Sequence, residues 1–192
     1  MRINLILFLL SLVISSSAQE PDPLAKIYNL EPRTADCLGA IPLIDKLGPV
    51  IGNNKIGANY EIKKQSEPNP YIFEWEHNVV WYKFEAEKTG MLHLLIAPVD
   101  PAENFDFILY EADGHWFCAD FHEYVHNPIS SNISETPGAT GLADLGTETY
   151  VTKEGVNKFS KPIKVEKGKT YYLVVDSPAG PNSGHSIEKE IK

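Results

Sequence analysis

The sequence predicts an all-β fold, a sandwich of antiparallel strands with one long irregular excursion. Short runs of β-branched and aromatic residues recur along the chain, and turns that contain glycine separate them. The 13 glycines and 14 prolines among 192 residues leave little room for long helices. Short connections between neighbouring runs favour antiparallel pairing, as in β-sandwiches.

The first predicted strands lie in the middle of the chain. Residues 79–84 and 91–96 are rich in β-branched, aromatic and aliphatic residues, and the turn 88–90 between them predicts a hairpin. Residues 105–110 form a third predicted strand, which ends before Asp113-Gly114. We expect Trp81, Tyr82 and strand 105–110 to be mostly core.

A second hairpin is predicted near the C-terminus. Residues 161–165 alternate between polar and apolar, a turn follows at 167–169, and residues 170–176 return as an apolar strand. Residues 185–187 predict a last short strand, with His185 as a structural residue at its start.

Residues 114–158 fit the strand pattern poorly. They are rich in Gly, Pro, Ser and Thr, and their hydrophobic periodicity is weak. A connection of this length in a compact domain is usually functional or partly structured. The shorter pieces 40–43 and 60–63 are candidates for edge strands.

The N-terminus predicts export. Arg2 precedes an apolar run that ends in small residues, which is typical of a signal peptide spanning 1–18. The alternative is a retained membrane anchor, although the run is short for a membrane span. Residues 19–33 are polar and spaced by prolines, which indicates a leader, and residues 34–192 are predicted to form the β-sandwich domain. The mature protein is expected to be secreted or periplasmic, with no transmembrane segment.

The chain is acidic, with a formal net charge of −9. Cleavage after residue 18 would remove Arg2, so the mature chain would be more acidic still. An acidic chain without a basic block is a poor partner for phosphate backbones, which argues against nucleic acid as a partner.

The sequence contains two cysteines, Cys37 and Cys118. An even pair in an exported protein usually forms a disulfide, and we expect one here. The alternative is two separate buried thiols.

A zinc site is one candidate for chemistry. His122, Glu123 and His126 match the H-E-x-x-H pattern, in which two imidazoles bind zinc and the glutamate acts as general base of a metallopeptidase. Pro128 would end any helix two residues after His126, and no third ligand is recognisable, so a chance match is the alternative. Adding His115 and Cys118 to the two histidines would give a structural zinc site that competes with the disulfide.

A calcium site is a second candidate. Asp100, Glu103, Asn104 and Asp106 place oxygen ligands on a loop that leads into a strand, and hard oxygen ligands suit Ca²⁺. The spacing is not that of an EF-hand. The alternative is a set of solvated carboxylates at the start of a strand.

Residues 74–78, Glu-Trp-Glu-His-Asn, form a third candidate. Polar groups beside an aromatic strand can make a carbohydrate-binding or peptide-binding patch. More often they cap the strand and hold a loop in place.

Eight segments, taken together and in order, resemble secreted β-sandwich modules of Bacteroidota. The segments are residues 36–41, 76–84, 104–110, 117–118, 128–134, 140–142, 171–176 and 184–187. Such modules often precede OmpA-like domains, and they are similar to the bacterial pre-peptidase C-terminal domain, which has a jelly-roll-like sandwich. The resemblance covers about residues 34–187 and implies a jelly-roll-like arrangement for this chain.

The resemblance also implies a non-catalytic binding or accessory role, and some relatives of the pre-peptidase type bind calcium. The H-E-x-x-H match falls in a variable connection of this pattern. We therefore expect an exported binding module, not an enzyme, whose partner is a cell-envelope or extracellular polymer or protein. Its binding surface is expected in the loop 98–106 and the excursion 114–158. A calcium-stabilised structural module and a zinc metallopeptidase are the alternatives.

Overall fold

The computed structural model describes residues 32–50, 61–62, 69–121, 126–179 and 182–192. The predicted signal peptide, 1–18, and most of the predicted leader, 19–33, lie outside these residues. Within the described part, no helix is long and apolar enough to cross a membrane.

The fold is a sandwich of two six-stranded sheets, so the all-β prediction is confirmed. The helical elements that are described are three short ones. They are η1 (Pro32–Ala35), η2 (Cys37–Gly39) and α1 (Phe117–Asp120).

Sheet A contains the strands in which most of the predicted core lies. Its order is β1 (Ile41–Pro42), β3 (Val80–Glu85), β11 (Thr170–Asp176), β5 (Asp106–Glu111), β6 (Ser130–Asn132) and β8 (Tyr150–Val151).

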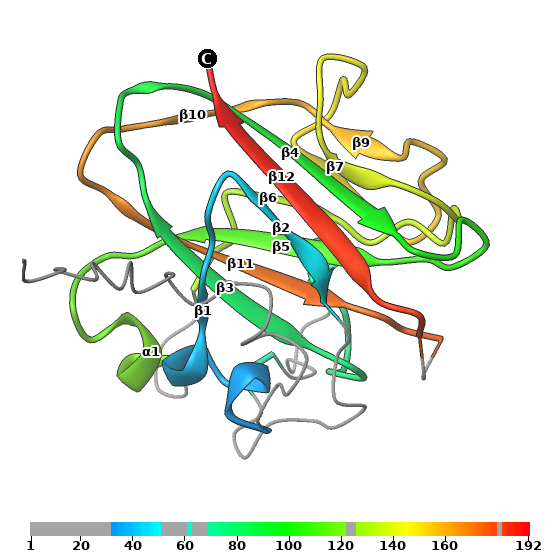
Figure 1. The fold of residues 1–192 in the computed structure, drawn as a ribbon, viewed down its shortest axis with the longest axis horizontal. Helices are drawn as coiled ribbons and strands as arrows, with labels where there is room; N and C mark the ends of the chain where they lie inside the picture. The colour runs from blue at the N-terminus through cyan, green and yellow to red at the C-terminus, as the bar shows by residue number, and fades with distance from the viewer. Residues whose placement is uncertain (1–31, 51–60, 63–68, 122–125, 180–181) are drawn as a thin grey trace, which may run out of the picture.

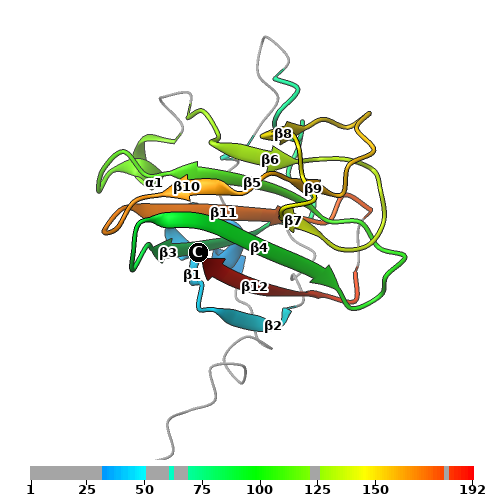
Figure 2. The ribbon, with the colours of Figure 1, turned by 90° about the horizontal axis from the view of Figure 1, so that it is seen from above.

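Sheet B is the second layer. Its order is β2 (Lys46–Val50), β12 (His185–Ile191), β4 (Gly90–Pro98), β7 (Thr140–Leu142) and β9 (Phe159–Ser160), while β10 (Ile163–Val165) also pairs with β4. Figure 2 shows β2, β12 and β4 side by side.

Both hairpin predictions are wrong, although all four strands exist. β3 and β4 follow each other in the chain but lie in different sheets, and so do β10 and β11. The two turns instead bond to each other: the Ala86 N–H donates to the Lys169 carbonyl, and the Gly168 N–H donates to the Ala86 carbonyl. A short turn reverses the direction of the chain. It does not determine which of the two sheets the following strand joins. Here each turn carries the chain from one layer to the other.

The sheets are mixed rather than purely antiparallel. Among the described residues, the long strands pair antiparallel, whereas β1 with β3, β6 with β8 and β7 with β9 are parallel. The excursion 114–158 supplies α1, β6, β7 and β8, so it is partly structured, as expected. Its short strands extend both sheets at one end.

The main core fills the space between the sheets. Side chains from β3, β5 and β11 meet those from β4, β7 and β12, including Tyr82, Phe107, Leu173, Leu94 and Ile187. Trp81, Tyr82 and residues 107–110 are almost completely buried, so the expectation that they are core is confirmed.

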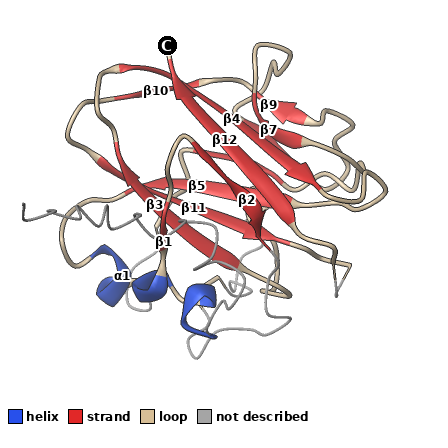
Figure 3. Cartoon of the chain, in the orientation of Figure 1, coloured by secondary structure: helices blue, strands red, loops and turns tan. Residues whose placement is uncertain are grey.

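The outer face of sheet A, which points away from sheet B, is also covered. Trp81, Ile108, Tyr110 and Val174 pack there against residues from outside the strands. We call the segments that supply these residues the cover: 32–40, 61–62, 69–78 and 117–121. Figure 1 shows the short helices of the cover on the side of sheet A opposite β4 and β12, and Figure 3 shows all described helices gathered there.

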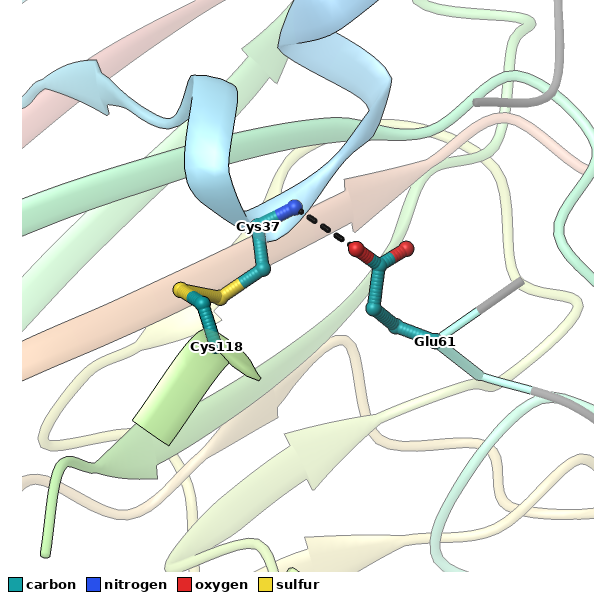
Figure 4. The surroundings of a disulfide bond; sticks show 3 residues. All are labelled: Cys37, Glu61 and Cys118. Carbon is teal, nitrogen blue, oxygen red and sulfur yellow. Dashed lines mark hydrogen bonds between the residues drawn. A yellow bond between two sulfur atoms is a disulfide. The ribbon is translucent and has the colours of Figure 1, made fainter. Parts of the chain in front are cut away.

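A disulfide fastens the cover together. Cys37 in η2 and Cys118 in α1 are bonded, with their Cα atoms 5.4 Å apart, so the predicted bridge is confirmed. Figure 4 shows the bond beside the Glu61 carboxylate, which accepts a 3.0 Å hydrogen bond from the Cys37 backbone N–H. The bridge therefore joins two parts of the cover that are 81 residues apart in sequence.

Candidate functional site

A cavity of about 480 Å³ lies where the cover meets one end of sheet A. Its wall comes from the cover segment 69–77, the start of β5, the residues after β6 and the residues after β8. The lining residues are Asn69, Pro70, Ile72, Phe73, Glu74, Trp75, His77, Asn104, Asp106, Ile133, Glu135, Lys153, Glu154 and Pro178.

Aromatic side chains form the part of the wall that belongs to the cover. Phe73 is buried in the cluster on the outer face of sheet A, whereas Trp75 is 50% exposed. A turn orders the start of this segment, because the Tyr71 N–H donates to the Asn69 side-chain oxygen over 3.0 Å. The cavity thus presents a large apolar surface that is open to solvent.

His77 on the cavity wall is held by a buried carboxylate. Asp176, at the end of β11, is fully buried and accepts hydrogen bonds from the backbone N–H groups of His77 (3.2 Å) and Asn78 (2.7 Å). Its second oxygen lies 2.9 Å from Nδ1 of His77. This hydrogen bond is the main cause that raises the pKa of His77. Asp176 therefore fixes both the backbone before β3 and the direction of the imidazole.

Asp106 supplies a second carboxyl group directly opposite. It pairs in register with Asp176 across β5 and β11, and only 6% of its surface is exposed. Burial, followed by the charge of Asp176, raises the pKa of Asp106 to about 8. The Asp106 carboxyl therefore holds a proton at neutral pH in the free protein.

Within the described residues, the Asp106 carboxyl group has one side-chain donor, and it bonds to one of the two oxygens. The Asn104 side-chain amide donates to Oδ1 over 3.3 Å. Among the described residues, nothing donates to Oδ2, although the side chain lines the cavity. A nearly buried residue of the cavity lining thus has a carboxyl oxygen without a donor among the described residues.

The rim of the cavity is mainly acidic. Glu74, Glu135 and Glu154 lie there with one lysine, Lys153, which forms a 3.1 Å ion pair with Glu135. The charge of Glu135 also contributes to the raised pKa of Asp106. The two basic groups of the lining, Lys153 and His77, are both paired with carboxylates.

The predicted calcium residues serve two different places. Asp100 accepts a hydrogen bond from the Ala102 N–H, and both oxygens of Glu103 accept hydrogen bonds from Ser183. Asn104 and Asp106 line the cavity instead. Within the described residues, no group of three or more His, Cys, Asp or Glu side chains is arranged to hold a metal ion.

The predicted zinc residues fall largely outside the described part, because His122 and Glu123 are not among the described residues. The His126 ring packs against Phe117 and Phe121, with centroids 4.6 and 4.7 Å away. The disulfide uses the Cys118 sulfur, which overturns the zinc site of His115, Cys118, His122 and His126.

Two further glutamates are buried inside the cover. Oε1 of Glu61 accepts from the Cys37 N–H, and Oε1 of Glu76 accepts from the Ile62 N–H over 2.8 Å. The Oε2 atom of each is buried and has no hydrogen-bond partner among the described residues. Burial is the largest cause that raises the pKa of Glu61 to about 7 and that of Glu76 to about 8. These carboxyl groups accept hydrogen bonds from backbone N–H groups of irregular segments, which lie outside the strands.

His185 belongs to the main core and not to the cavity. It begins β12 and is 1% exposed, and its Nε2 lies 2.8 Å from the Tyr82 hydroxyl. Burial lowers the pKa of His185 to about 3, so the ring is neutral. It is a structural residue, as expected.

Sequence reasoning found part of the cavity and missed the rest. The patch 74–78 supplies Glu74, Trp75 and His77, and the acidic loop supplies Asn104 and Asp106. Glu135 and Lys153 lie inside the excursion without any pattern to mark them. The aromatic run in 69–73 was a usable signal, but it resembles an ordinary core segment.

The chain matches no protein-family model. Searches among curated proteins and solved structures also found no match.

Proposed function

We propose that this protein is an exported, non-catalytic binding module that holds a cell-envelope or extracellular polymer or protein in the cavity beside Trp75. One observation carries the proposal: a cavity of about 480 Å³ whose lining combines a half-exposed tryptophan with polar residues. Binding sites typically join an apolar surface to a few placed polar groups that fix the orientation of the ligand.

The wall has both parts of such a site. The Trp75 indole offers a broad apolar face, and an exposed tryptophan at a concave site is a common anchor for a partner. His77, Asn104 and Asp106 supply polar groups whose positions are fixed by Asp176 and by strand pairing. The proposed binding residues thus lie mainly on segments that connect the strands of a rigid sandwich.

Export and the absence of catalysis are parts of the same proposal. A disulfide is usual in proteins of oxidising compartments, which supports secretion or a periplasmic location. The resemblance to secreted β-sandwich modules points the same way.

Retention of the purified protein on immobilised ligands tests the proposal. The panel contains chitin, cellulose, peptidoglycan and an array of immobilised peptides. We expect retention on at least one of these and a dissociation constant at least about tenfold weaker for Trp75→Ala, which is about 1.4 kcal/mol.

Trp116→Ala is the matched control, because Trp116 is 69% exposed and does not line the cavity. It should bind within about twofold of the unchanged protein. Circular dichroism confirms that both variants fold. Failure of the unchanged protein to bind any member of the panel, or equal losses in the two variants, would overturn the proposal.

A further inference from the structure

We propose that the cavity binds the side-chain ammonium group of a lysine in an extracellular protein or peptide, held by the Asp106 carboxylate and the Trp75 indole. This inference rests on the proposed function and names the chemistry of the ligand. It follows from the charges that surround the cavity, from an Asp106 oxygen that has no donor among the described residues, and from the exposed aromatic ring.

The charge balance of the wall favours a cation. Acidic side chains outnumber basic ones, and each basic group is already paired, Lys153 with Glu135 and His77 with Asp176. The whole chain carries a net charge of −9, which adds long-range attraction for a basic partner. An anionic ligand would meet repulsion from both sources.

The Asp106 carboxyl provides the specific contact. Asp106 lines the cavity and is 94% buried, and its Oδ2 atom has no donor among the described residues. A buried carboxylate opposite another carboxylate is unfavourable unless a cation accompanies it. An ammonium group in the cavity would supply both the missing donor and the missing charge.

The Trp75 indole provides a surface for the methylene stem of the lysine and a second contact for its ammonium group. The indole is half exposed, and an indole ring is the best aromatic partner for a cation. The methylene stem of a lysine packs on apolar surface while its ammonium group reaches polar partners. A carbohydrate would use the ring but would leave the carboxyl group without a positive partner.

Binding should be coupled to the protonation of Asp106. Because the pKa of Asp106 is about 8, the carboxyl must release its proton to the solvent before it pairs with an ammonium group, which keeps its own proton. The titratable groups that surround it are Asp176 on β11, His77 before β3, Glu135 after β6, and Lys153 and Glu154 after β8. The affinity for lysine should therefore rise as the pH rises toward 8.

Titration with two capped peptides tests the inference. One is Gly-Gly-Lys-Gly-Gly and the other is the same peptide with Nε-acetyl-lysine, which keeps the length and loses the charge. We expect the lysine peptide to bind the purified protein at least about tenfold more tightly at pH 8. Its affinity should rise about tenfold from pH 6.5 to pH 8, because the ionised fraction of Asp106 rises by about that factor.

Two variants separate the contacts. Asp106→Asn should abolish the preference for lysine and most of the pH dependence, and Trp75→Ala should weaken the binding of both peptides. Protonation of His77 would also repel an ammonium group at low pH, so loss of most of the pH dependence in Asp106→Asn assigns that part to Asp106. Glu166→Gln, an exposed change outside the cavity, should alter neither property. If Asp106→Asn fails to fold, the peptide comparison on the unchanged protein decides alone.

The outcomes distinguish the two proposals. Equal binding of the two peptides, or retention on chitin, cellulose or peptidoglycan that needs Trp75 without any preference for lysine, overturns the lysine inference and leaves the binding module standing. Absence of any binding that depends on Trp75 overturns both.

Discussion

The two faces of sheet A are stabilised in different ways. Toward sheet B, side chains such as Phe107 and Leu173 meet apolar side chains of facing strands. On the outer face, Trp81 and Tyr110 meet irregular segments that are joined by a disulfide and by the buried carboxyl groups of Glu61 and Glu76. Strand pairing provides the backbone hydrogen bonds of the sheets, whereas in the cover the carboxyl groups of Glu61 and Glu76 accept some of the backbone N–H groups. The binding cavity lies on the second side, where polar groups are already part of the structure.

If the cover depends on its covalent link, removing the link should have the largest effect on stability. Replacing both cysteines, Cys37→Ala with Cys118→Ala, should lower the free energy of unfolding by about 4 kcal/mol, because the bridge closes a long loop in the unfolded chain. Urea denaturation measures this loss. Each single replacement should cost nearly as much as the pair, since either one removes the bridge. A loss below about 1 kcal/mol would mean that the cover holds without the link.

The buried carboxyl groups should make the cover sensitive to pH. The pKa of Glu76 rises from 4.5 to about 8 on folding. Between pH 4.5 and about pH 8, the Glu76 carboxyl group is therefore protonated in the folded protein and ionised in the unfolded chain. The contribution of Glu76 to stability is therefore greatest below pH 4.5 and decreases as the pH rises through 8. Glu76→Gln should remove this dependence, so its stability relative to the unchanged protein should increase by about 3 to 4 kcal/mol between pH 5 and pH 8.

Urea denaturation at pH 5, 6.5 and 8 checks the effect. Glutamine keeps the oxygen that accepts from the Ile62 N–H, so the variant removes the charge and retains that hydrogen bond. The exposed Glu166→Gln is the matched control and should follow the unchanged protein at every pH. Parallel pH curves for Glu76→Gln and the unchanged protein would contradict the assigned role of the buried carboxyl group.

The inner face was largely predictable from sequence, but its connectivity was not. Alternating and continuous apolar runs identify β3, β5 and β11, because burial of side chains sets the pattern. The turns before β4 and β11 look like hairpin turns, yet they bond to each other and change sheets. These hydrogen bonds join residues that are far apart in the chain, so a local sequence pattern cannot predict them.

The outer face was much harder to predict. The number of cysteines and the export signal predicted the bridge, and the acidic loop identified Asp106 as a candidate. The raised pKa of Asp106 comes first from its burial and then from its position opposite Asp176. That position follows from the register of β5 and β11 and from no spacing in the sequence. The burial of Glu61 likewise depends on how the cover folds over sheet A.

The three tryptophans allow binding of a lysine in the cavity to be tested in a single titration. Trp75 lines the cavity, Trp81 is buried beneath the cover, and Trp116 is exposed elsewhere. Their indole N–H signals can be followed by NMR in ¹⁵N-labelled protein, and Trp→Phe variants assign them. As the lysine peptide is added, we expect a large shift of the Trp75 signal and an unchanged Trp116 signal. A shift of Trp116 with Trp75 unmoved, or no shift at all, would contradict binding of the lysine in the cavity.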